Sequence, residues 1–533
     1  MQPKRHMGKP QRKSGERPTE EAGKRKAHRA EASPRPPSKT DTTAAARDLL
    51  GWIMHPGSGA TSVAERRVTR DVFIADTLEK DAKHTADRGA AYFAQPPADV
   101  AKLLPSGVAW STERMRAAVA TGKLNHGTDI NVVRFDPKLQ RRVPLKTEGK
   151  VLLAEYDQAL ASGWSVRFLR PQEHEAELSS LLFLFDEAMQ CSTGMNSYWT
   201  PPGSQGFAPH YDDVEVFMLQ LEGSKRWRVY APPEPADVLC RTSSPDYKPA
   251  DMGAPLMDVW LKAGEVLYLP RGFIHQGITS EDEHSLHVTL SAFQMHTYAD
   301  LAKRMMDYKL ELIAKTDVDA RRALPVGWLD CVGGAFNKAS MGPYSAVPGA
   351  AGASELGAEA GAALRKEVFA QVRRVVAKAA ADVAAKDGIV DKGADLFATD
   401  VLARRQPPAA TVAAAAASDL PAAALDSATA QLRLVARNAC RVVVMADEVE
   451  LHHCGGNSKV CLGDPTLPPK ISFDIAFAPA LVALISAYPK WRKVSELPFP
   501  ELEDEDVTAL QDAQQSLLDA LVSTRVFDAR PCQ

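Results

Sequence analysis

The chain has 533 residues, of which 45% are hydrophobic and 25% are charged, a composition typical of a globular protein with two or more domains. No apolar run approaches the roughly 18–20 residues of a membrane span, and the N-terminus lacks the apolar core of a secretory signal peptide, so we expect no membrane partner. The seven cysteines are odd in number and scattered, which favours reduced thiols in an intracellular compartment.

Positive charge is concentrated at the N-terminus. Residues 1–40 hold twelve Lys/Arg and four Asp/Glu, a net charge of +8 in a chain whose total is −3. Proline, serine and glycine are frequent there and apolar residues are rare, so we expect a basic, disordered tail over residues 1–45. Such a tail can contact RNA or serve as a nuclear import signal; a solvated tail without a specific partner is the simpler alternative.

The first half of the remaining chain predicts a mixed α and β structure. Residues 49–54 indicate the start of a helix, residues 165–169 a short strand, and residues 173–190 a helix with apolar side chains at helical spacing. Residues 195–293 alternate β-rich runs with Pro/Gly turns, as in a small barrel or sandwich. The predicted strands are 214–221, 225–230, 265–270 and 286–293, and the predicted turns are 201–203, 222–224 and 270–272.

The second half begins with helical patterns at 296–380, with a helix at 364–384. Residues 406–430, rich in alanine and proline, are typical of a loop insertion. A final compact unit runs from about 431 to 528, starting with the apolar run at 440–445 and ending in an amphipathic helix near 507–522.

Three residues could hold a metal ion. His210 and Asp212 are two positions apart, so on an extended segment they point to the same side. His275 supplies a third ligand, and two histidines with one carboxylate form the facial triad of non-haem iron(II) oxygenases. The H-x-D pair is weak evidence by itself, because such triplets are common, and Asp213 and Glu215 are alternative acids nearby.

Two strands add to this pattern. Lys225 shares a strand face with Trp227 and Val229, and a buried ammonium is costly unless it meets an anion. The distal carboxylate of 2-oxoglutarate is such an anion; an internal salt bridge, or a lysine that reaches out to water, is the alternative. On the strand at 286–293, His287 lies on a polar face with Thr289 and Ser291, which predicts either a cavity lining or a solvent-facing side of a sheet.

A second possible metal set contains His452, His453, Cys454 and Cys461. Its spacing matches no standard zinc pattern, so a turn at Gly455-Gly456-Asn457 is the preferred interpretation.

Long motifs around the triad resemble a known family. The segments NSYWTPPGSQGFAPHYDDVEVFMLQLEGSKRWRVY (196–230), CRTSSPDYKPADMGAP (240–255) and AGEVLYLPRGFIHQ (263–276) are similar to the JmjC ribosomal oxygenases, most closely to their nucleolar histidyl-hydroxylase branch. The sequence departs from the family's usual pattern at Ser197 and Leu269, and neither departure removes a ligand.

The resemblance implies an α+β architecture of several parts. A JmjC double-stranded β-helix of the jelly-roll or cupin type is expected at 46–297, after the tail at 1–45. A helical dimerisation region follows at 298–390, then an Ala/Pro-rich insert at 391–430 and a winged-helix-like domain at 431–530.

The resemblance also implies roles for individual residues. Iron(II) is expected on His210, Asp212 and His275, and 2-oxoglutarate on Lys225. Asn196 and His287 are expected at the cosubstrate end of the site, and Arg167, Tyr198 and Ser291 near the peptide substrate.

The implied reaction uses O2 to hydroxylate the β-carbon of a histidine in a large-subunit ribosomal protein. A homodimer in the nucleus, in the nucleolus, is also implied. Two other functions remain open: a histone lysine demethylase with the same iron chemistry, which would make the protein a chromatin regulator, and a non-catalytic module that binds RNA or ribosome precursors.

Overall fold

The computed structural model describes residues 41–57, 62–136, 138–139, 141–333, 358–408, 425–457, 469–499 and 507–531. The predicted basic tail up to residue 40, most of the predicted loop insertion and Cys461 lie outside the described residues. None of the described helices is both long and apolar enough to cross a membrane. The described cysteines are free and buried.

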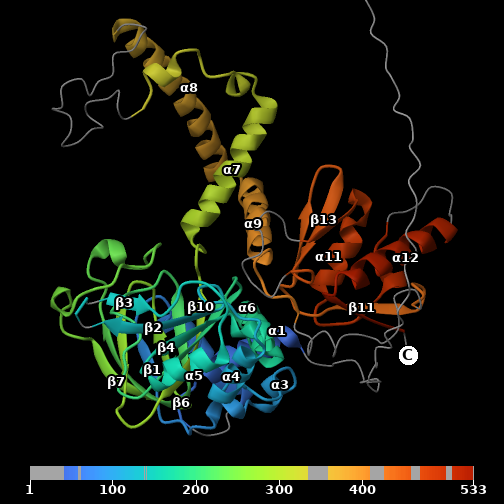
Figure 1. The fold of residues 1–533 in the computed structure, drawn as a ribbon. Coiled ribbons are helices and arrows are strands. Elements are labelled where there is room, and N and C mark those ends of the chain that lie inside the picture. The colour runs from blue at the N-terminus through green and yellow to red at the C-terminus, as the bar shows by residue number, and fades with distance from the viewer. Residues whose placement is uncertain are drawn as a thin grey trace, which may run out of the picture. The chain divides into compact units, whose positions relative to one another are not determined.

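A ten-stranded antiparallel sheet forms the centre of the N-terminal half (Figure 1). Its main path runs in the order β1-β8-β6-β10-β5-β4-β2-β3, and β7 and β9 pair with β6 off this path. The strands are β1 (Lys83–Thr85), β2 (Ile130–Asp136), β3 (Arg141–Pro144), β4 (Ser165–Leu169), β5 (Gly194–Thr200), β6 (Glu215–Tyr230), β7 (Met257–Lys262), β8 (Val266–Leu269), β9 (Ile274–Thr279) and β10 (Ser285–Ala292).

Strand β6 joins the two parts of this sheet. Its first half pairs with β8 and β10 and its second half with β7 and β9. The turn predicted at 222–224 is therefore wrong. The chain bends there without ending the strand, because Gly223 adopts a positive φ of 62° next to a shift in the β6–β10 register, as in a β-bulge.

Helices pack against the sheet (Figure 1), and two of them overlap the predicted helical segments. The buried helix α6 (Ala176–Met189) lies within the range predicted at 173–190. The predicted helix start at 49–54 is wrong, because that segment ends α1 (Thr42–Met54), whose first turn is capped by the Asp41 side chain. Helix α1 therefore begins inside the range 1–45 that was predicted for the tail. The other helices here are α2 (Val63–Asp76), α3 (Ala98–Ala101), α4 (Thr112–Ala120) and α5 (Leu153–Ala161).

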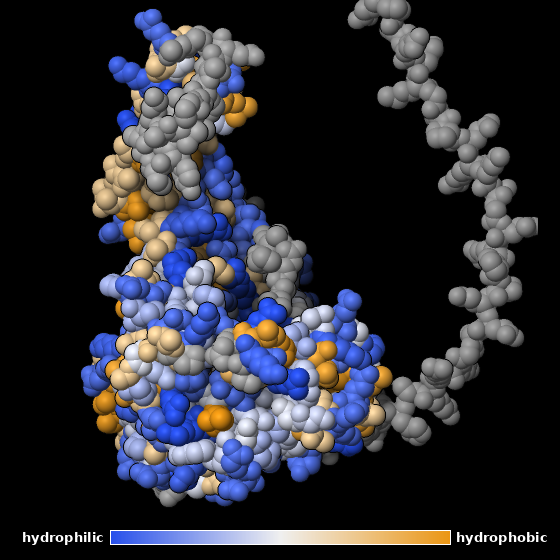
Figure 2. Space-filling view, turned by 60° about the vertical axis from the view of Figure 1, so that its left-hand side comes forward, coloured by the Kyte–Doolittle hydropathy of each residue, from blue (hydrophilic) through white to orange (hydrophobic). Residues whose placement is uncertain are grey.

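Three α-helices follow the sheet in the part of the chain that the structure describes: α7 (Tyr298–Thr316), α8 (Ala358–Ala385) and α9 (Asp387–Leu402). Helix α7 packs against both others, and the Lys309–Asp382 and Arg304–Asp400 ion pairs link them. The predicted helix at 364–384 lies inside α8, whereas α9 occupies the first part of the range assigned to the insert. Hydrophobic side chains are visible on the surface of this helical segment (Figure 2), where the exposed ones are Val318, Leu324, Val326, Leu329, Val372 and Val376.

In the described residues the C-terminal unit contains two three-stranded sheets and two α-helices. One sheet has the order β15-β11-β16 and the other β12-β13-β14. The predicted apolar run at 440–445 forms β12, and the predicted amphipathic helix forms α12. The elements are β11 (Ala430–Leu434), β12 (Cys440–Val444), β13 (Glu448–His453), β14 (Lys470–Asp474), α11 (Ala478–Ser486), β15 (Arg492–Lys493), α12 (Val507–Ser523) and β16 (Phe527–Pro531).

Buried polar contacts tie the segment after α9 to helix α6. Arg405 forms a 3.0 Å ion pair with Glu187, and the two side chains are 2% and 0% exposed. The neighbouring Gln406 N–H donates to Asp186 over 2.8 Å. Asn438, in the C-terminal unit, donates from its side chain to the same Glu187 over 3.1 Å. Breaking a buried pair of this kind is strongly destabilising, so these bonds hold the three segments together.

Candidate metal centre and its cavity

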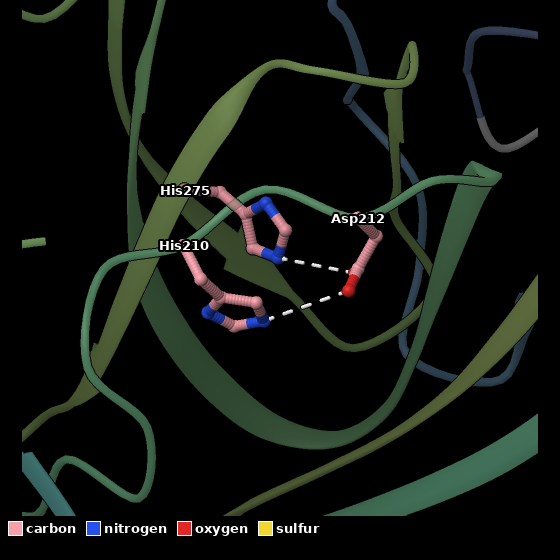
Figure 3. Close-up of side chains that lie close together, drawn as sticks. All are labelled: His210, Asp212 and His275. Atoms are coloured by element: carbon pink, nitrogen blue, oxygen red, sulfur yellow. Dashed lines mark ion pairs between the residues drawn. The ribbon is translucent and has the colours of Figure 1, made fainter. Parts of the chain in front are cut away.

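His210, Asp212 and His275 converge on one point at the edge of the sheet (Figure 3). Their ligand atoms all lie within 4.8 Å of one another. The Nε2 atoms of His210 and His275 are 3.8 and 3.7 Å from the two carboxylate oxygens of Asp212. Backbone hydrogen bonds between His210 and His275 in both directions hold the two histidines side by side.

The imidazole rings are oriented for metal binding. His210 Nδ1 lies 2.8 Å from the carbonyl oxygen of Ala208, and His275 Nδ1 lies 3.2 Å from that of Phe273. When each Nδ1–H donates to its carbonyl, Nε2 is left with a free lone pair facing Asp212. Burial lowers the pKa of His275 to about 4, which keeps its ring neutral, as a metal ligand must be.

The two other acids near this point are engaged elsewhere. Asp213 accepts hydrogen bonds from Ser243 and Gln294. Glu215 is fully buried and bonds to Tyr268 and Arg271. Asp212 is therefore the acid that faces both histidines, and among the described residues these three form the one group with metal-binding geometry.

A cavity of about 260 Å³ adjoins the triad. Residues from β4, β5, β6, β9 and β10 line it, with others from β3 and the loops around them. The lining residues are Arg142, Arg167, Tyr198, Phe207, Ala208, His210, Asp212, Val216, Met218, Lys225, Trp227, Ser243, Ser244, Asp246, His275, Gln276, Gly277, His287 and Thr289.

Lys225 is a buried cation without a counter-ion. Its side chain is 4% exposed and forms no ion pair with any residue that the structure describes; it donates one 3.2 Å hydrogen bond to Thr200 Oγ1 and lies over the Trp227 ring. Burial lowers its pKa from 10.5 to about 7. Neither alternative from the sequence applies within the described structure, since the ammonium is neither salt-bridged nor in water. A carboxylate entering the cavity would supply the missing charge.

The polar face of β10 borders this cavity rather than solvent. His287 is 2% exposed, is stacked on the Tyr198 ring at 4.9 Å, and its Nδ1 has no hydrogen-bond partner in the described structure. Burial lowers the pKa of His287 well below its usual value, so its ring is neutral. The solvent-facing alternative for this strand is wrong, because Thr289 is buried and lines the cavity as well. Arg167, on β4, lines the same cavity beside its cross-strand neighbour Tyr198.

Asn196 and Ser291 lie in a neighbouring pocket. Asn196 lies two residues before Tyr198 on β5, and Ser291 lies two residues after Thr289 on the antiparallel strand β10. Both line a separate hollow of about 250 Å³. The structure thus places Arg167, Tyr198 and His287 with the triad and Lys225, and it places Asn196 and Ser291 beside them.

Two residues of the site were not found from the sequence. Thr200 accepts the hydrogen bond of the Lys225 ammonium, and Arg142, in the cavity lining, places its guanidinium over the Phe207 ring at 5.0 Å. Arg142 comes from β3, far from both motifs, so no local signal could have placed it.

The second proposed metal set does not form a site among the described residues. His452 pairs with Glu450 over 2.7 Å, and Cys454 is fully buried. Cys461 lies outside the described residues, and the predicted turn after Cys454 is present.

Two family models match parts of the chain. Residues 172–301 match the JmjC domain, and residues 414–515 match the C-terminal winged helix domain of ribosomal oxygenase 1. A solved structure of YcfD, a ribosomal oxygenase from Escherichia coli in complex with cobalt and succinic acid, aligns over 86% of this chain and 98% of its own, with 15% identity and a TM-score of 0.43.

Curated relatives match more of the sequence. The chain is 38% identical over 280 residues to the bifunctional lysine-specific demethylase and histidyl-hydroxylase NO66 of Drosophila willistoni, covering 52% of the chain and 33% of that protein; it thus spans about a third of this relative's length. It is 30% identical over 465 residues to ribosomal oxygenase 1 of Danio rerio, covering 85% of the chain and 76% of that protein. The chain therefore belongs to the ribosomal oxygenase 1 family of JmjC-domain proteins.

Proposed function

We propose that the protein is an iron(II)- and 2-oxoglutarate-dependent oxygenase that hydroxylates a histidine side chain of a large-subunit ribosomal protein. The observation that carries this proposal is the pairing, in one cavity, of the His210–Asp212–His275 cluster with the unpaired cation of Lys225. The triad can hold a metal ion through three side chains and leave other coordination positions of the ion open. Lys225 can neutralise the distal carboxylate of a dicarboxylate ligand.

The cosubstrates supply the oxidising power. Iron(II), 2-oxoglutarate and O2 together insert one oxygen atom into an unactivated C–H bond, with succinate and carbon dioxide as the other products. The protein holds the metal through His210, Asp212 and His275 and fixes the distal carboxylate with Lys225 and the neighbouring Thr200 hydroxyl. Trp227, Val216 and Met218 give the cavity apolar walls, which exclude water from the reacting groups.

A histidine substrate fits the charge of the cavity. Arg142 and Arg167 line it together with Lys225, whereas its carboxylates are Asp246 and the triad residue Asp212. This excess of positive charge favours a neutral imidazole over a cation. The hydroxyl of Tyr198, the cross-strand neighbour of Arg167, lines the same cavity and offers a partner for a ring nitrogen. The name of the Drosophila relatives joins histidyl hydroxylation with lysine demethylation, and the names of other relatives refer to the ribosome.

Lysine demethylation is the second candidate. The aromatic rings of Tyr198, Phe207 and Trp227 line the cavity, and aromatic rings attract methylammonium groups. Arg142 and Arg167 in the same cavity oppose this, since they raise the cost of bringing in another positive charge. A purely non-catalytic binding module is disfavoured, because it needs neither the convergent ligands nor a buried lysine without a counter-ion.

The test is an activity screen read by mass spectrometry. The full chain is incubated with iron(II), 2-oxoglutarate and two peptide sets, one spanning the histidines of large-subunit ribosomal proteins and one carrying methylated histone lysines. A gain of one oxygen on a histidine is the expected result. The Lys225→Met variant is the matched control and should show neither change. Loss of a methyl group alone would favour the second candidate. If the wild type produces neither change, the oxygenase proposal is refuted.

We also propose that the protein acts in the nucleus, in the nucleolus, as a homodimer. The basic N-terminal segment and the family membership support this location, and the exposed apolar residues of α8 and its surroundings support self-association. An RNA contact through the basic segment is part of the same proposal.

A further inference from the structure

We propose that the substrate polypeptide continues from the metal cavity into the neighbouring pocket at the ends of β5 and β10, and that Arg404, which follows α9, binds it there. This inference rests on the proposed function and adds a substrate-binding residue from outside the JmjC domain. The segment that binds is the stretch of substrate backbone flanking the modified residue.

The two hollows share one wall. Tyr198 and Asn196 occupy successive positions on one face of β5, and Thr289 and Ser291 do so on β10, since side chains on a strand alternate between faces. Tyr198 and Thr289 line the metal cavity, whereas Asn196 and Ser291 line the pocket beside it. A chain whose reactive side chain reaches the triad therefore meets this pocket with its flanking residues.

The pocket presents polar groups without partners. The side chains of Asn196, Ser291 and Ser192 line it and form no hydrogen bond with the part of the chain that the structure describes. An extended polypeptide carries a donor and an acceptor at every residue, and these need partners once they leave water. The pocket therefore suits a backbone segment better than an apolar ligand.

Arg404 supplies the pocket's uncommitted positive charge. The other arginine in its lining, Arg170, is paired with Glu173 and Asp129. Asp400 is near enough for Arg404 to lower its pKa by charge attraction, but the Asp400 carboxylate is already paired with Arg304 over 3.3 Å. The Arg404 guanidinium itself forms no hydrogen bond or ion pair with a described residue. It can therefore donate to a carbonyl or carboxylate oxygen of the bound segment.

The backbone next to Arg404 is fixed to the catalytic half of the chain. Arg405 is locked by its buried pair with Glu187, and the Gln406 N–H by its bond to Asp186. A long side chain on an anchored backbone loses less freedom on binding than one on a free loop. The position of Arg404 at the pocket is thus built into the fold.

The test combines arginine variants with peptide truncation. The full chain, with Arg404→Ala, Arg404→Gln and Arg404→Lys, is assayed on the ribosomal peptide that the wild type oxidises best and on two shortened forms, each cut close to the oxidised residue on one side. Arg116→Gln is the matched control, because Arg116 pairs with Asp157 on the surface and lines none of the described cavities. Unfolding midpoints show whether each variant keeps its fold.

The expected result is a rise of about tenfold in KM for the full-length peptide in Arg404→Ala and Arg404→Gln, with a smaller change in kcat, from loss of a charge-assisted hydrogen bond. Arg404→Lys should recover part of the loss, and Arg116→Gln should match the wild type. One of the two shortened peptides should have a raised KM that no longer depends on Arg404. If KM is unchanged in folded Arg404 variants, or if both shortened peptides remain equally sensitive to them, this inference is overturned while the proposed function stands. If the wild type oxidises no peptide, the proposed function fails and this inference falls with it.

Discussion

Replacing Lys225 by methionine should raise the stability of the protein and weaken its binding of the cosubstrate. In the described structure the ammonium is 4% exposed and has Thr200 as its one hydrogen-bond partner and no counter-ion. Methionine has a similar length and no charge, so it fills the same space without the desolvation cost. We expect the variant to be more stable than the wild type when metal and cosubstrate are absent, and to bind 2-oxoglutarate poorly.

The size of the effect follows from the lysine pKa. Burial lowers this pKa from 10.5 to about 7. Keeping the buried lysine protonated therefore lowers the free energy of unfolding by about 4–5 kcal/mol. The unfolded chain holds this proton up to a higher pH than the folded chain does. Between pH 7 and pH 10.5 the free energy of unfolding of the wild type therefore rises with pH. The advantage of Lys225→Met is largest at pH 7 and below, and it falls by about 2–3 kcal/mol between pH 7 and pH 9.

Two measurements check this reasoning. Chemical denaturation at pH 7 and pH 9, without metal or cosubstrate, compares the wild type with Lys225→Met and with Lys262→Met, an exposed lysine on β7 that serves as control. Titration with 2-oxoglutarate should show affinity reduced by about 10–100-fold in Lys225→Met alone, from the loss of one charged hydrogen-bonding partner. A variant that is less stable than the wild type at pH 7, or that keeps normal affinity for 2-oxoglutarate, would refute the account of this residue.

Further predictions concern the bonds that hold the fold and the site together. Glu187→Gln should lower the free energy of unfolding by about 3–5 kcal/mol, because it leaves the buried Arg405 without its counter-charge; equal stability in denaturation curves would show that the pair does not hold these segments. Gly223→Ala should also destabilise the protein, by roughly 2 kcal/mol or more, since its φ is 62° and an added Cβ would lie 1.8 Å from the His284 carbonyl oxygen; a variant of normal stability would mean that β6 can bend elsewhere. Leu181→Ala, in the fully buried part of α6, should cost about 2–5 kcal/mol without changing metal affinity, which metal titration of the folded variant can check.

Local sequence patterns predicted the elements that are regular and deeply buried. The strand at 165–169 and the helix α6 were found because alternation and helical spacing persist over their whole lengths. Strand β9, which carries His275, was not predicted, since polar residues and Gly277 interrupt its pattern. The continuity of β6 was missed for a related reason: Gly223 in a strand bulge has the same local signature as Gly in a turn.

The candidate site could be predicted where its residues lie within the two motifs. The spacing of His210 and Asp212 and the strand alternation at Lys225 both indicate side chains that share a face, and the structure places them in one cavity. Arg142 and Arg404 reach the cavities from other segments through tertiary packing. No periodicity in a single stretch of sequence reports such contacts.

The central claim, that His210, Asp212 and His275 form a metal centre, is tested most directly by counting bound metal. The full chain is stripped of metal and titrated with cobalt(II) or, without oxygen, with iron(II), and the stoichiometry is measured for the wild type and for alanine variants of the three residues. Asp213→Ala is the matched control, since Asp213 is bonded to Ser243 and Gln294 instead. We predict one tightly bound ion per wild-type or Asp213→Ala chain and loss of tight binding in the three variants, which should remain folded. Undiminished binding in those variants, or no binding by the wild type, would contradict the claim.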